Sequence, residues 1–136
     1  MCKLKRGKYY VGDPCYIFDQ SWFEIVNKIE HIKTGGQVVE LFRKRCYIGN
    51  TEYGDGIYRD NKNRWYNVDT GLIAVLPVSL VARDGYLTVK AIEKHGGMHI
   101  IDFKQDFEVR QEGGVLYFGE IIIDTKGVDF NSDDEI

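Results

Sequence analysis

The sequence lacks the features that would identify a secreted, metal-binding or membrane-spanning protein. Only three of its 136 residues are cysteines, and their spacing is not that of a metal site. No apolar run approaches the length of a membrane span, and the charged N-terminus does not resemble a signal peptide. These absences predict a cytosolic protein with reduced thiols and no membrane partner.

Proline and net charge are also scarce. Two prolines against fifteen glycines allow turns without interrupting strands. The net charge of −3 is too small to indicate a nucleic-acid partner. We expect residues 1–125 to form a single mostly-β domain that needs neither a disulfide nor a metal to fold, followed by an acidic, flexible tail over residues 126–136.

Familiar catalytic and nucleotide-binding motifs are missing. The chain has no Walker motif, no G-x-G-x-x-G and no G-x-S-x-G. Cys15 has no histidine at a suggestive distance, and a free cysteine in a strand is usually a small buried side chain. His95 and His99 flank two glycines, which predicts a hairpin turn and not a metal-binding helix. We therefore predict no catalytic residue, no metal and no cofactor.

One helix is predicted over residues 21–33. Ser21 and Glu24 form a capping box, and two glycines at 35 and 36 end the segment. Apolar residues follow the capping box at helical spacing, namely Trp22, Ile25, Val26, Ile29 and Ile32.

Aromatic residues make up 13% of the chain, which favours strands for the remainder. Short strands are predicted around residues 8–18 and at 37–42, 46–53, 57–60, 64–68, 72–77, 80–82, 86–92, 99–103, 107–110 and 115–123. The apolar run Leu72–Pro77 predicts a central strand buried on both faces. Together these segments predict a mainly β protein with one helix, of the α+β class. Its antiparallel meander would close as a curled barrel or form a sandwich.

The most informative stretch is residues 54–72, a predicted hairpin with Asp55 near its start and Asp69 near its end. Asp13, between a glycine and a proline, is a third carboxylate that would join them. Converging carboxylates bind divalent cations or shift one another's pKa. Aspartates in turns also cap main-chain amides, so a structural role, ligand binding and metal binding all remain open.

A basic run at residues 43–45 lies close in sequence to tyrosines, a combination suited to an anionic ligand. We accordingly predict a ligand-binding site and no reaction centre. The predicted ligand-binding residues are Asp13, Tyr16, Arg43, Arg45, Asp55, Tyr58, Trp65 and Asp69.

The motifs GDPCY (12–16), GDGIY (54–58) and VDTG (68–71), with Trp22 between the first two, occur in a recognisable order. This order, over residues 8–77, resembles small proteins of bacteriophages and bacteria that have no assigned activity, and more distantly the DUF4241 type of domain. The resemblance implies a phage or bacterial cytosolic setting and identifies no catalytic residue.

The preferred hypothesis is a non-enzymatic binding protein, a phage accessory factor. It would occupy a host protein, such as a defence protein, or sequester a small anionic, nucleotide-like ligand. One alternative is a metal-dependent hydrolase that uses Asp13, Asp55 and Asp69, which requires these carboxylates to meet at one point. Another is a structural or assembly protein that forms homo-oligomers through an exposed strand edge.

Overall fold

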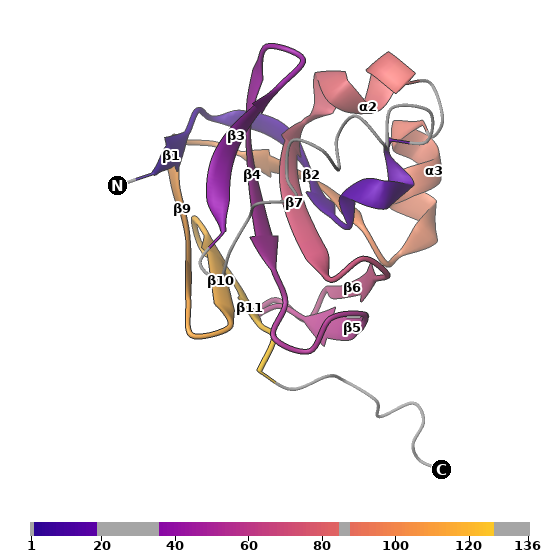
Figure 1. Cartoon of the computed structure of the whole chain (residues 1–136). Helices are drawn as coiled ribbons and strands as arrows, with labels where there is room; N and C mark the ends of the chain where they lie inside the picture. The colour runs from indigo at the N-terminus through magenta and orange to yellow at the C-terminus, as the bar shows by residue number, and fades with distance from the viewer. Residues whose placement is uncertain (1, 19–35, 85–87, 127–136) are drawn as a thin grey trace.

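The computed structural model describes residues 2–18, 36–84 and 88–126 (Figure 1). Within them the protein is mainly β with two α-helices, which confirms the α+β class. The predicted helix over residues 21–33 and residues 127–136 of the predicted tail lie outside the described residues. The elements are β1 (Lys3–Leu4), β2 (Gly7–Gly12), η1 (Pro14–Tyr16), β3 (Gln37–Leu41), β4 (Lys44–Asn50), β5 (Gly56–Arg59), β6 (Trp65–Val68), β7 (Leu72–Pro77), α2 (Val78–Asp84), α3 (Val89–His95), β8 (His99–Phe103), β9 (Phe107–Glu112), β10 (Val115–Phe118) and β11 (Ile121–Asp124).

The strands form three antiparallel sheets. The largest has the order β3-β4-β7-β2-β8, a second has the order β1-β9-β10-β11, and β5 pairs with β6. Strand β7 occupies the centre of the five-stranded sheet, and its four middle residues are buried. The prediction of a central strand at Leu72–Pro77 is therefore confirmed. The sheets do not close into a barrel.

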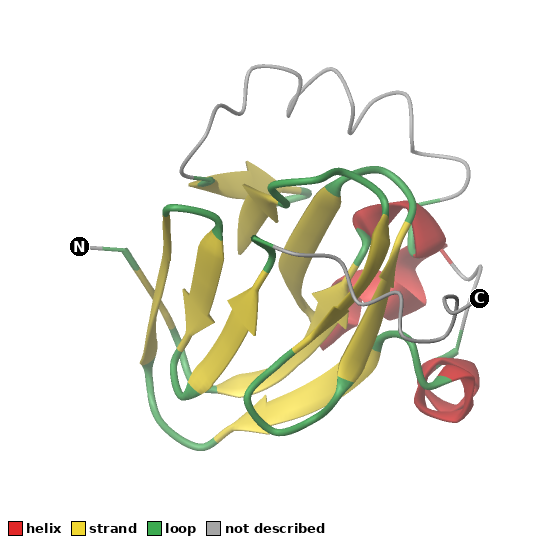
Figure 2. Ribbon diagram, turned by 90° about the horizontal axis from the view of Figure 1, so that it is seen from below, coloured by secondary structure: helices red, strands yellow, loops and turns green. Residues whose placement is uncertain are grey.

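The five-stranded sheet separates two apolar clusters. On β2, Tyr9 and Val11 face a cluster shared with the other two sheets. Tyr10, between them, faces a second cluster with Leu80 of α2 and Ile92 of α3. The alternation follows the two-residue period of a strand. Figure 2 shows both helices grouped on one side of the molecule, as this division of the core requires.

Two predicted strands are wrong, because residues 80–82 lie in α2 and most of 86–92 lies in α3. The side chain of Thr88 accepts a hydrogen bond from the main-chain N of Ala91 at 3.1 Å and caps the start of α3. Gly96 ends the helix in the left-handed region, with φ of 88°. The glycines between His95 and His99 thus end a helix, and the predicted hairpin turn is wrong.

The predicted strand over residues 115–123 is in fact the hairpin β10–β11. It turns at Gly119, whose φ of 63° is available to glycine at little cost. The hairpin brings Glu120 to the tip and places Ile121 opposite Phe118. This tip forms one wall of the cavity described below.

Candidate functional site

Asp13 is a fully buried carboxylate that joins two loops. Its Oδ1 accepts hydrogen bonds from the main-chain N of Cys15 and from Oγ1 of Thr70, both at 2.9 Å. Its Oδ2 accepts from the main-chain N of Asp69 at 2.6 Å and of Thr70 at 2.8 Å. Donors of the protein itself therefore occupy both carboxylate oxygens. This arrangement makes Asp13 a structural tie between the two loops.

Tyr16 and Asp69 lie next to this tie. The Tyr16 hydroxyl donates to the Asp69 carboxylate and accepts from Nδ2 of Asn67 at 2.9 Å. Burial raises the pKa of Tyr16, and the hydrogen bond to Asp69 raises it further, so this hydroxyl remains a donor at neutral pH. Three predicted ligand-binding residues, Asp13, Tyr16 and Asp69, are thus brought together.

The carboxylate of Asp55, by contrast, is exposed to solvent in the loop before β5. Among the described residues, no three side chains of His, Cys, Asp or Glu are placed to hold a metal ion. The geometry that the hydrolase alternative requires, with Asp13, Asp55 and Asp69 at one point, is not formed.

Two predicted aromatic residues have mainly packing roles. Tyr58 is fully buried opposite Tyr66, and its hydroxyl donates to the carbonyl of Gly54 at 2.9 Å. Trp65 is half-buried, with its indole against the glycines at the end of α3.

The two predicted arginines lie on the β3–β4 hairpin. Arg43 is exposed in its turn, and Arg45 donates from Nε to the carbonyl of Lys3 at 3.1 Å. Neither lines the cavity described below.

Cys15 and Cys46 are poor nucleophiles. Burial raises the pKa of the Cys15 thiol, and the negative charge of Asp13 raises it further. Burial raises the pKa of Cys46 to about 12. Because the thiolate is the reactive form, neither thiol is activated at neutral pH.

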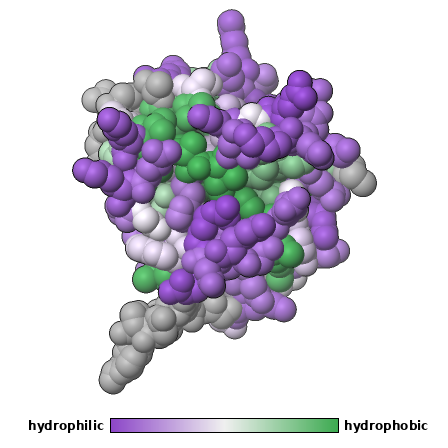
Figure 3. All heavy atoms as spheres, turned by 180° about the vertical axis from the view of Figure 1, so that it is seen from behind, coloured by the Kyte–Doolittle hydropathy of each residue, from purple (hydrophilic) through white to green (hydrophobic). Residues whose placement is uncertain are grey.

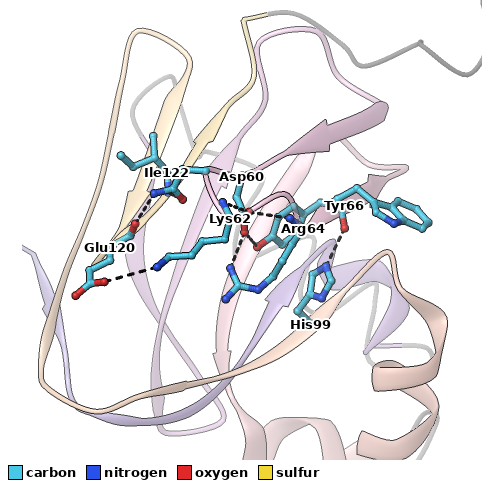
Figure 4. A network of polar contacts seen from close by, with 9 residues as sticks. Asp60, Lys62, Arg64, Tyr66, His99, Glu120 and Ile122 are labelled. Carbon is cyan, nitrogen blue, oxygen red and sulfur yellow. Dashed lines mark hydrogen bonds and ion pairs between the residues drawn. The ribbon is translucent and has the colours of Figure 1, made fainter.

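A second buried carboxylate, Asp60, organises the turn between β5 and β6 (Figure 4). It accepts from the main-chain N of Lys62 at 2.8 Å and of Arg64 at 2.9 Å. Its Oδ2 also accepts from Nη1 of Arg64 at 2.8 Å and from the hydroxyl of Tyr66 at 2.7 Å. Burial acts to raise the pKa of Asp60, but hydrogen bonds from Tyr66 and Arg64 outweigh it and lower the pKa below its usual value.

His99 of β8 completes the same network. Its Nε2 lies 2.8 Å from the carbonyl oxygen of Trp65, and because a carbonyl can only accept, Nε2 carries the proton. The imidazole packs edge-on against the Tyr66 ring, with 4.9 Å between centroids. Burial lowers the pKa of His99, so the ring is neutral at pH 7. The network therefore holds one anion, Asp60, and one cation, Arg64.

Arg64 borders a cavity of about 460 Å³, which we call the Arg64 groove. Its walls are the β5–β6 turn, residues 101–108 of β8, β9 and their loop, and the tip of the β10–β11 hairpin. Phe103 and Phe107 line it as a stacked pair with ring centroids 3.7 Å apart. The lining residues are Lys62, Arg64, Ile101, Asp102, Phe103, Lys104, Gln105, Asp106, Phe107, Glu108, Gly119, Glu120 and Ile121.

The carboxylates at the rim of the groove all have basic partners. Each ion pair also has at least one well-exposed side chain, so these pairs contribute little stability and rearrange easily. The pairs are Asp102–Lys104 at 2.7 Å, Asp106–Lys5 at 3.9 Å, Glu108–Arg110 at 3.9 Å and Glu120–Lys62 at 4.0 Å. The face opposite to the view of Figure 1 carries a hydrophobic patch with hydrophilic residues around it (Figure 3).

Sequence reasoning missed most of this site. Asp60 and Arg64 lie in the predicted hairpin over residues 54–72, but neither is among the predicted ligand-binding residues. The available signal was their spacing, since a turn flanked by Asp and Arg four residues apart can close an ion pair across itself. Residues 101–108 carried no such signal.

The chain matches no family model, no curated protein and no solved structure. The resemblance to small phage and bacterial proteins, and the more distant one to the DUF4241 type of domain, thus stays a prediction. Among the described residues, no helix is both long enough and apolar enough to cross a membrane.

Proposed function

We propose that the protein is a non-enzymatic binding module whose Arg64 groove holds an anionic ligand. The observation that carries the proposal is the position of Arg64. One of its guanidinium nitrogens is held at 2.8 Å by the fully buried carboxylate of Asp60, while the side chain remains 31% exposed at the groove.

A guanidinium fixed in this way is suited to recognition. It presents its remaining N–H donors in one orientation, and a planar fork of donors matches a carboxylate or a phosphate. Because Asp60 already restricts the Arg64 side chain in the folded protein, ligand binding costs less side-chain entropy. Lys62, on the same turn, adds a second positive charge, which forms a long ion pair of 4.0 Å with Glu120.

The apolar part of the groove indicates what else the ligand carries. Ile101 and the stacked rings of Phe103 and Phe107 line the cavity beside the charged groups. Binding pockets commonly combine an apolar surface with a few oriented polar groups. A ligand with an acidic group and an apolar or aromatic portion fits this combination, in keeping with the expected sequestration of a small anion.

The state of the titratable groups supports binding over catalysis. Burial raises the pKa of the Cys15 thiol, and the neutral His99 already uses Nε2 on a main-chain carbonyl.

We treat the five-stranded and the four-stranded sheet as the two layers of a sandwich, and we place the Arg64 groove where the two layers separate. A phage or bacterial cytosol is the proposed setting.

Calorimetric titration tests the proposal with benzoate, phenyl phosphate and adenosine monophosphate as probes. Lys62→Glu reverses a charge at the groove without touching the core, and Lys90→Glu makes the same change on the exposed surface of α3. We expect at least one probe to bind, and Lys62→Glu to weaken it about tenfold, which is 1.4 kcal/mol. Lys90→Glu should leave the Kd unchanged.

Arg64→Lys provides a second variant. Lysine retains the positive charge but lacks the planar fork, so it should weaken the same probe while circular dichroism shows an intact fold. The proposal fails if none of the three probes binds, or if Lys62→Glu and Lys90→Glu bind the probe equally well.

A further inference from the structure

The Arg64 groove runs along an unpaired strand edge. Among the described strands, β8 is an edge strand of the five-stranded sheet and pairs with β2 alone. Three of its residues, Ile101, Asp102 and Phe103, line the groove. An edge strand presents main-chain N–H and C=O groups that have no partner within the sheet.

The pairing register identifies these groups. Tyr9 lies opposite Pro77 of β7, and proline has no N–H, so this position is not a hydrogen-bonded pair. The main chain of Tyr9 therefore bonds to β8, where its partner is Ile101. Hydrogen bonding alternates along an antiparallel strand, so Ile100 and Asp102 direct their N–H and C=O groups away from β2.

The hydrogen bonding between β4 and β7 independently gives the same orientation for the main chain of β8. The main-chain N of Thr51 donates to the carbonyl of Gly71 at 2.9 Å, which extends the β4–β7 ladder by one pair. Counting in twos from Gly71, the main chains of Ile73 and Val75 also face β4. The main chain of Ala74, between them, therefore faces β2, where it meets Gly12. Val11 then bonds to β8 at His99. Ile100 and Asp102 again face the open edge.

Strand β6 covers only the beginning of this edge. The main-chain N of Asn67 donates to the carbonyl of Gly97 at 2.8 Å, and His99 contacts the Trp65 carbonyl. Beyond His99, the described residues supply no further main-chain bond to β8 from that side. The groove, with Arg64 on its far wall, takes the place of a neighbouring strand.

We propose that the Arg64 groove takes an extended peptide, which adds to β8 as a further strand and places a carboxylate on Arg64. The inference rests on the proposed function and names the class of its ligand. The main-chain groups of Ile100 and Asp102 need a partner with alternating donors and acceptors at strand spacing, which a peptide backbone supplies. The apolar wall at Phe103 and Phe107 receives a side chain of the peptide.

A peptide is selected from a displayed library of random heptapeptides with free C-termini and then synthesised. Asp102→Pro is the main variant, because it removes the outward-facing N–H without removing a bond to β2. Asp102→Ala is its control, since it removes the same carboxylate and keeps the N–H. We expect Asp102→Pro to bind the peptide at least tenfold more weakly than Asp102→Ala, and the small anionic probe to bind the two variants equally.

Two measurements do not depend on the folding of Asp102→Pro. N-methylation of alternate amides of the peptide should abolish binding to the wild-type protein when the methylated amides face β8. Amide exchange at Ile100 and Asp102 should slow when the unmodified peptide binds. Amidating the peptide C-terminus, or replacing its acidic side chains by amides, shows which carboxylate Arg64 holds.

The outcomes separate this inference from the proposed function. If the peptide binds Asp102→Pro as well as wild type, and every methylated form still binds, the strand addition is refuted while small-anion binding stands. If none of the three small anions binds, the proposed function itself fails. If light scattering shows a dimer that Asp102→Pro converts to a monomer, a second copy of the chain occupies the edge and the peptide inference is overturned.

Discussion

The carboxylate of Asp13 accepts a hydrogen bond from the main chain of Asp69 at 2.6 Å, although the two residues are 56 positions apart. The contact attaches η1, which follows β2, to the loop that leads from β6 into β7. Strands β2 and β7 are neighbours in the five-stranded sheet. One buried side chain thus fixes the ends of two adjacent strands.

Asp13→Ala should be strongly destabilising. It leaves the amides of Cys15, Asp69 and Thr70 without their acceptor, and buried donors that lose a partner cost about 1 kcal/mol or more each. We expect a loss of about 3 kcal/mol in the free energy of unfolding, measured by urea denaturation. Asp55→Ala, at an exposed aspartate, should change stability by less than about 0.5 kcal/mol. Equal effects of the two substitutions would contradict a structural role for Asp13.

Asp60 should make the free energy of unfolding depend on pH in the acid range. Its pKa in the folded protein is lowered, so its contribution is present above the unfolded pKa of about 4 and is lost as pH falls through the folded value. Asp60→Asn should cost about 3 kcal/mol at pH 7, because it leaves Arg64 without its anionic partner.

The same variant should show a shallower loss of stability below pH 4 than wild type, measured by thermal unfolding across a pH series. Asp55→Asn is the matched control and should keep the wild-type slope. An unchanged slope in Asp60→Asn would show that Asp60 does not carry the acid dependence.

Gly49 tests the packing between the two larger sheets. A Cβ at this position would lie 2.5 Å from Cδ2 of Leu116 and 2.9 Å from Oε1 of Gln111. Gly49→Ala should therefore destabilise the protein by about 1–3 kcal/mol through overpacking, whereas Glu40→Ala, at an exposed position of β3, should not. The double variant with Leu116→Ala should lose less than the sum of the two single changes, as measured by denaturant midpoints.

The three thiols should differ in reactivity towards Ellman's reagent at pH 8. Cys2 is exposed and should react first, whereas Cys46 is fully buried, with a pKa of about 12. Cys46 should react only on unfolding, and Cys2→Ser should remove the fast phase. Fast modification of two thiols in native Cys2→Ser would contradict this placement of the cysteines.

Strand signals in the sequence were reliable where burial was uniform or alternating. The apolar run Leu72–Pro77 is a buried strand as predicted, and β5 and β6 lie within one residue of the strands predicted at 57–60 and 64–68. Helices α2 and α3 were mistaken for strands because each is only 7 residues long and contains β-branched residues. Thr88 and Gly96, which cap α3, were the local signals against a strand, but they compete with turn chemistry that uses the same residue types.

Sequence motifs drew attention to Asp13, Tyr16 and Asp69, and the structure brings these three residues together. None of them lines the Arg64 groove. The Arg64 groove depends on the β5–β6 turn, β8 and the β10–β11 tip meeting in space. No local pattern in Arg64, Ile101 or Glu120 encodes that meeting, because it follows from how the sheets pack.

The position of β2 also affects how the chain folds. β2 is an early strand, yet its two neighbours, β7 and β8, begin at residues 72 and 99. Its hydrogen bonds therefore close long loops, and pairing over such separations slows folding. During synthesis at the ribosome, β2 can pair with β7 only after residue 77 has emerged. The main chains of Tyr9 and Val11 have no β8 partner until residue 101 has emerged. This interval is when the nascent chain is most exposed to aggregation, and when a chaperone would have most effect.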